Sequence, residues 1–185
     1  MKRTLFLLIT FALVFTACSF SKKPQVVQKK QIEIPTNAPK WVYENTLKNH
    51  MVAPGVTKDL NEKELAFQKQ KAMINAGHNL TKKIYVKTVN LYKAYLEKLN
   101  NPKIFEKDIK KFAEHIALKS LTHSKIKNNW ISPENDLFVQ VGVDSNIVAE
   151  QIQYSSKLLF GADKNLYHNF LSNRAKKDII TYLEK

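Results

Sequence analysis

One stretch, from Asn61 to Leu99, constrains the fold more than any other part of the chain, because its apolar residues recur at the spacing of an α-helix. These residues are Leu65, Ala72, Ala76, Leu80, Ile84, Leu91, Tyr95 and Leu99. Lysines lie mostly between them, so the stretch predicts one long amphipathic helix. Asn61 and Glu64 have the spacing of an N-terminal capping arrangement. Gly77 and the two alanines indicate close packing of this helix against a sheet.

The apolar period changes to two in residues 125–131 and 137–143, which predicts two β-strands. One face is expected to carry Ile126, Asn128 and Trp130, and another to carry Leu137, Val139, Val141 and Val143. The segment SPEND between the two strands predicts a hairpin turn. We expect Trp130 and Val141 to face the core, and Trp41 to cover the edge of the hairpin.

The remaining segments predict one more strand and further helices. Residues 50–59 are typical of an extended segment, in which Gly55 permits a bend or a close backbone approach. After the Asn-Asn-Pro break at 100–102, a second helical stripe consists of Phe105, Ile109, Phe112, Ala113, Ile116 and Ala117. Asp144 and Ser145 begin another helix, which Gly161 closes. The order of elements predicts an α+β fold: a small antiparallel sheet packed on a long amphipathic helix, with additional C-terminal helices.

The first 17 residues have the three-part organisation of an exported precursor. Two basic residues precede an apolar run, residues 4–14, and two small residues stand directly before Cys18, the only cysteine of the chain. The apolar run is shorter than the about 20 residues that a membrane-spanning helix needs. The segment resembles a bacterial lipoprotein signal peptide, with Phe15 at the place where Leu is usual, and so predicts lipidation of Cys18. An ordinary signal peptide cut near Ala17 is the alternative.

Cleavage before Cys18 leaves 185 − 17 = 168 residues and lowers the formal charge from +14 to +12, because two basic residues are removed. A chain of this length suits one domain. The predicted organisation is a signal peptide at 1–17, a tether at 18–36, an α+β domain at 37–160 and a helical tail at 161–185. Without a second cysteine the domain has no disulfide and depends on its apolar core.

Catalytic and metal-binding patterns are absent from the sequence. The five histidines, His50, His78, His115, His123 and His168, do not occur at the i, i+4 spacing that places two imidazoles on one helical face. No serine lies in a G-x-S-x-G motif, and no glycine-rich loop precedes a helix. Asp136 and Asp144 are explained as a turn residue and a helix cap. We therefore expect no enzyme, no catalytic residue, no metal and no cofactor.

Four short motifs resemble the Lpp-twenty lipoprotein family in their order and spacing. They are PKWV at 39–42, APGV at 53–56, KAMINAGHNL at 71–80 and LFVQVGVD at 137–144. The resemblance implies a lipid-anchored α+β domain, and some members of that family form ring or disk structures of the polar flagellar apparatus beneath the outer membrane. Met73 stands where the family's helix commonly has Arg. The tail after Leu159 is longer than the resemblance leads us to expect, and the resemblance ends before it, which favours a role of the tail in assembly.

Two functional hypotheses follow. In the first, the protein is an outer-membrane lipoprotein, attached through acylated Cys18 and facing the periplasm, with a structural or assembly role as a homo-oligomer or with envelope or flagellar proteins. Ser19, in place of Asp, favours the outer membrane. In the second, a monomeric binding module presents its basic surface to an acidic envelope ligand. An exported, lipid-anchored chain rarely meets nucleic acid, so none is expected as a partner.

Overall fold

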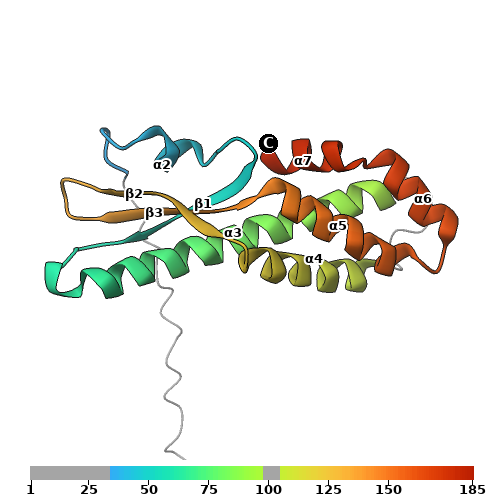
Figure 1. The fold of residues 1–185 in the computed structure, drawn as a ribbon, viewed down its shortest axis with the longest axis horizontal. Coiled ribbons are helices and arrows are strands. Elements are labelled where there is room, and N and C mark those ends of the chain that lie inside the picture. Colours follow the sequence, from blue (N-terminus) through green and yellow to red (C-terminus); the bar gives the residue numbers. More distant parts are fainter. Residues whose placement is uncertain (1–33, 98–104) are drawn as a thin grey trace, which may run out of the picture. The chain divides into compact units, whose positions relative to one another are not determined.

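The computed structural model describes residues 34–97 and 105–185, so Cys18, the signal peptide, Leu99 and Pro102 lie outside the described residues. The elements are α2 (Lys40–Glu44), β1 (His50–Thr57), the 3₁₀ turn η1 (Glu62–Glu64), α3 (Leu65–Leu96), α4 (Glu106–Leu121), β2 (Lys125–Ile131), β3 (Leu137–Asp144), α5 (Ser145–Phe160), α6 (Lys164–Asn173) and α7 (Lys176–Glu184). The predicted α+β class, with a small antiparallel sheet on one long helix, is confirmed (Figure 1).

The long helix begins at Leu65, the first residue of the predicted apolar stripe, and not directly after the predicted cap Asn61. Asn61 caps η1 instead of α3, because its side-chain oxygen accepts a hydrogen bond from the amide of Lys63 at 3.1 Å. Leu65, the first residue of α3, is 44% exposed. The described stripe positions from Ala72 to Tyr95 are buried, as predicted.

The three strands have the order β1-β3-β2, and both pairings are antiparallel. The N-terminal half of α3 packs against β1 and β3. Gly55 of β1 lies so close to this helix that a Cβ atom there would overlap the backbone of Ala72 and Ala76. The predicted close approach at Gly55 is therefore confirmed, and the two alanines are the helix residues that allow it.

Both faces of the central strand β3 are covered, and they belong to different layers. Leu137, Val139, Val141 and Val143 are buried in the core that α3 shares. On the opposite face, Phe138 is 3% exposed and Gln140 is fully buried. The amide of Gln140 donates to the carbonyl of Trp41 in α2 at 3.4 Å, and its oxygen accepts from Asn128 at 2.8 Å. The short helix α2 thus covers the face of the sheet that α3 does not (Figure 1).

Trp130 lies on the face opposite to the one predicted. The register of β2 against β3 shifts between Ile126 and Asn128, so Ile126 pairs with Val141 whereas Trp130 pairs with Phe138. Directly paired residues share a face, and the Trp130 and Phe138 rings are in contact, with centroids 5.4 Å apart. A bulge adds one residue to a strand and reverses its alternation, which a strict period of two cannot anticipate. The prediction that Val141 faces the core is correct.

The C-terminal half of α3 belongs to a second, helical part of the core. Tyr92 and Tyr95 contact both Phe160 of α5 and Phe170 of α6, with ring centroids 5.1–5.9 Å apart. Their hydroxyls donate to the carbonyls of Ile152 at 2.8 Å and Leu166 at 2.7 Å. Burial raises the pKa of Tyr92 far above its usual range, so this hydroxyl stays a neutral donor.

Residues 161–185 form two helices that pack into the same core, so the tail is part of the compact unit Ile34–Lys185. The chain leaves the helical conformation at Arg174, which has φ −137° and ψ 61°. Each helix then buries its own pair of apolar residues at i, i+4 spacing: Leu166 and Phe170 in α6, Ile179 and Leu183 in α7. The apolar positions drift around a single helix because they belong to two helices with different axes.

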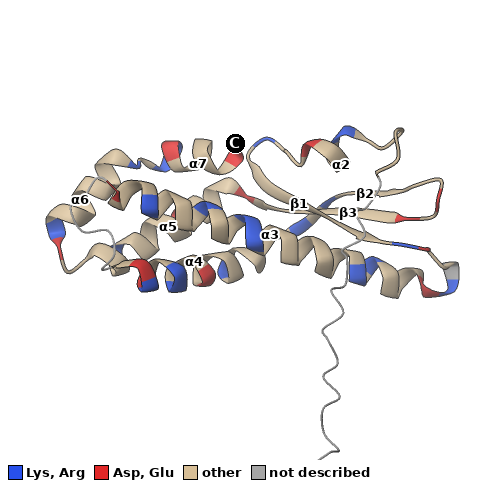
Figure 2. Ribbon diagram, turned by 180° about the vertical axis from the view of Figure 1, so that it is seen from behind, with Lys and Arg blue, Asp and Glu red and all other residues tan. Residues whose placement is uncertain are grey.

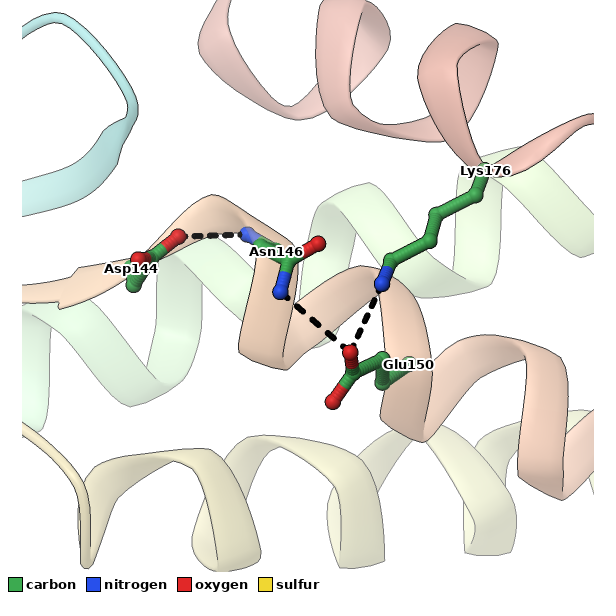
Figure 3. Close-up of polar contacts among 4 residues, drawn as sticks. All are labelled: Asp144, Asn146, Glu150 and Lys176. Atoms are coloured by element: carbon green, nitrogen blue, oxygen red, sulfur yellow. Dashed lines mark hydrogen bonds and ion pairs between the residues drawn. The ribbon is translucent and has the colours of Figure 1, made fainter.

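Polar contacts also hold α7 against α5 (Figure 3). Asp144 caps α5 by accepting from the amide of Asn146 at 2.8 Å. Glu150, one turn further along, accepts from the Asn146 side chain at 3.2 Å and from the ammonium of Lys176 at 2.6 Å. The hydrogen bond and charge of Lys176 lower the pKa of Glu150. Asp144 is thus a cap, as predicted, and Lys176 connects the tail to the domain.

The contact at Gly55 predicts opposite outcomes for two glycine substitutions. Gly55→Ala should destabilise the domain by several kcal/mol, because β1 and α3 must separate to admit the methyl group. Gly77→Ala, within α3, should stabilise it by up to about 1 kcal/mol, because the added Cβ meets only Leu121 at an ordinary 3.5 Å. Urea unfolding of residues 18–185 with Cys18→Ser measures both changes, and equal stabilities for the two variants would contradict the close approach.

Truncation after Gly161 should unfold the domain. It removes four buried apolar side chains, each worth about 1.5–3 kcal/mol, whereas a whole domain is stable by only about 5–15 kcal/mol. It also exposes the rings of Tyr92 and Tyr95. Circular dichroism of the truncated and complete chains checks this, with Lys176→Ala as a control that removes one exposed ion pair and should change stability by less than about 1 kcal/mol. A truncated chain with unchanged melting temperature would show that the tail is not required for the core.

Candidate interaction surface

The predicted candidate residues do not assemble into a catalytic or metal site in the described part of the chain. Cys18 precedes it. No group of three or more His, Cys, Asp or Glu side chains that could hold a metal ion occurs within residues 34–97 and 105–185. Four of the histidines, those at 78, 115, 123 and 168, are exposed on separate helices or turns. Asp136 accepts a hydrogen bond from the amide of Asp59 at 3.3 Å, which joins the hairpin turn to the end of β1, in keeping with its predicted turn role.

His50 has a structural environment that the sequence does not indicate. Its two ring nitrogens lie 2.9 Å from the carbonyl oxygen of Lys48 and 2.8 Å from the ammonium of Lys127. Lys127 belongs to the bulge of β2, and its aliphatic chain crosses the sheet over Gly142, where a Cβ atom would come within 3.0 Å of it. Lys127 is therefore held down on the sheet instead of projecting into solvent.

Two lysines of α3 also serve the fold. Lys83 donates to the carbonyls of Asn45 at 3.2 Å and Val52 at 3.1 Å. Lys87 donates to the carbonyl of Tyr182 at 3.2 Å and lies 5.2 Å from the centre of its ring. Burial lowers the pKa of both lysines, and the charge of Lys87 adds to the effect on Lys83. These cations bind the loop before β1 and the end of α7 to the long helix.

The other basic residues do not gather into one patch. In Figure 2 the Lys and Arg positions are spread over most of the helices, and acidic positions lie among them. Within the described ranges, two ion pairs form, Lys110 with Glu106 at 3.0 Å and Lys176 with Glu150 at 2.6 Å. The positive charge is thus spread over the described surface. The two cavities between α3 and α4 are not lined mainly by cations.

An apolar groove lies on the described surface. It has a volume of about 590 Å³ and lies between α3, the end of α4 and the start of β2. Its walls include Met73, Ile74, Leu118, Leu121 and Ile126. Ile74 is 65% exposed and Leu118 is 54% exposed. Clustered apolar side chains left in water mark interaction sites more often than single ones do.

The apolar surface continues along α3 towards the hairpin. Phe67, two helical turns before Ile74, is 65% exposed on the same flank of the helix. Ile131, at the end of β2, is 47% exposed and pairs with Leu137, so it projects on the α3 side of the sheet. We call the four residues Phe67, Ile74, Leu118 and Ile131 the β2-side surface. The sequence does carry a signal for two of them, because Phe67 and Ile74 are large apolar residues that interrupt the lysine-bearing flank of α3.

The free edge of β2 borders this surface. Among the described strands β2 pairs only with β3, so its other edge has no strand beside it. Its central residues Asn128–Ile131 carry no charge, and Asn129 is exposed. An uncovered strand edge presents backbone donors and acceptors that can pair with another strand. Together, the edge and the β2-side surface are equipped for a protein contact.

Comparison with known proteins found no family model that matches the chain and no curated protein that matches it. None of the described helices is both long and apolar enough to cross a membrane.

Proposed function

We propose that the protein is a lipid-anchored envelope lipoprotein with a structural or assembly role. The observation that carries the proposal is the N-terminal sequence, in which a short apolar run ends in two small residues and Cys18. A cysteine in that position receives lipid on its sulfur and on its new amino group. Several acyl chains, each contributing about 0.8 kcal/mol per buried methylene, make the attachment effectively permanent. Ser19 favours the outer membrane, with the domain in the periplasm.

The assembly part of the proposal is supported by the β2-side surface. Its exposed apolar side chains lie next to the edge of β2, which has no other described strand beside it. This combination suits a protein partner or a second copy better than a small acidic ligand. The resemblance to the Lpp-twenty family points the same way, since some of its members build flagellar rings or disks. A place in the flagellar apparatus is the specific form of the proposal that this resemblance suggests.

The alternative function, a monomeric module for an acidic envelope ligand, has less support. The formal charge of +14 favours contact with anions. However, Lys83, Lys87 and Lys127 are engaged in internal contacts, and the remaining cations are dispersed. Such a protein would recognise an anion through a cluster of free cations, and the described surface does not supply one.

Substitution of the cysteine tests the anchor. Cys18→Ala should abolish incorporation of radioactive fatty acid and release the domain from membranes, because no other residue of the chain can form the thioether. Ser19→Ala, next to it, serves as the control and should retain the label. If the Cys18→Ala protein still carried fatty acid and sedimented with membranes, the lipoprotein assignment would be wrong.

Size distinguishes assembly from the monomeric alternative. Residues 18–185 with Cys18→Ser should form oligomers that sediment faster than a monomer and dissociate on dilution. Analytical ultracentrifugation over a range of concentrations makes the measurement. A monomer at every concentration, combined with saturable binding to vesicles of anionic lipid, would favour the binding module instead.

A further inference from the structure

We propose that two copies of the chain associate through the free edge of β2, antiparallel about a two-fold axis at Asn129, so that their three-stranded sheets join into one. This inference specifies the partner in the assembly role proposed above and rests on that role.

The edge of β2 is protected at one end only. Natural proteins use lysines and bulges to prevent a strand edge from pairing with another strand. The bulge of β2 lies at its start, between Ile126 and Asn128, and Lys127 is held across the sheet by its 2.8 Å contact with His50. From Asn128 to Ile131 the strand is regular and uncharged, and none of the described residues pairs with its outer side as a strand. This segment has the properties of a pairing edge.

The charges flanking the strand select the antiparallel arrangement. Lys125 begins β2, and Glu134 lies in the turn that follows it; both residues are exposed. An antiparallel pair centred on Asn129 places Lys125 of one copy beside Pro133 and Glu134 of the other, and the symmetry makes this contact twice. A parallel pair in register would place Lys125 beside Lys125. Charge complementarity thus favours the two-fold arrangement.

The same arrangement covers the β2-side surface. A two-fold axis perpendicular to the sheet keeps the α3 side of both copies on the same side of the joined sheet. Neighbouring strands lie about 4.8 Å apart, so the uncovered flanks of the two sheets face each other below the new strand pair. Phe67 and Ile74 of α3 and Ile131 of β2, each between 47% and 65% exposed in the single chain, gain apolar neighbours there. A second copy therefore supplies what both the edge and the flank lack.

A single cysteine tests the register. In residues 18–185 with Cys18→Ser, Asn129→Cys is the only thiol, and antiparallel pairing about this position places the two Cα atoms about 4.5–5.5 Å apart, within the range of a disulfide. Mild oxidation should give a covalent dimer in high yield. The control is Asn169→Cys, which is also exposed but lies on α6; it should give no disulfide-linked dimer under the same oxidation.

A charge exchange tests the complementarity. Lys125→Glu and Glu134→Lys, each alone, should raise the dimer dissociation constant by roughly 2–30-fold, and the double variant should restore it. Both positions are exposed, so melting temperatures should not change. If the Asn129→Cys chain forms oligomers that do not cross-link on oxidation, or if oligomers are insensitive to the charge exchange, this interface is wrong and the assembly role remains. A chain that is monomeric at every concentration would overturn both.

Discussion

The structure depends on the close contact between β1 and α3 at Gly55. The helix can approach the strand only because the strand has no Cβ there and the helix presents Ala72 and Ala76. Thr57 then reaches the carbonyl of Gln68 at 3.1 Å, and Lys83 reaches that of Val52 at 3.1 Å. These bonds fix the direction of α3 along the sheet, and the helix is long enough to leave the sheet and organise α4–α7 around its second half.

One helix therefore serves two kinds of core. Under the sheet its buried apolar residues are small or aliphatic, because a strand lies against them. Beyond the sheet they include Tyr92 and Tyr95, whose rings pack against Phe160 of α5 and Phe170 of α6. The hydroxyl of each tyrosine binds a backbone carbonyl of a packed helix, which satisfies a buried polar group that would otherwise be costly. The tail helices are part of this arrangement and complete it.

Because α3 lies under only part of the sheet, it leaves the flank beneath β2 open. The described sheet has three strands, and α3 lies beneath β1 and β3, so the underside of β2 is left to Ile126, Ile131 and the neighbouring residues of α3. The proposed N-terminal lipid anchor would favour such lateral contact between copies, because tethering raises the local concentration.

The sequence by itself determined the elements whose apolar period is uniform, namely the α3 stripe, the α4 stripe and the strand β3. It also determined the extended segment of β1, the ends of α5 and the fold class. It also carries the N-terminal pattern that predicts a lipid anchor, because this pattern consists of adjacent residues only. The tertiary structure decided three other features. The bulge at Ile126–Asn128 turned Trp130 to the α2 face, the break at Arg174 divided the tail into two helices, and the side of α3 nearest β2 was left in water. None of these can be obtained from periodicity, because each depends on which surface lies opposite a residue, and that is settled only when distant segments pack together.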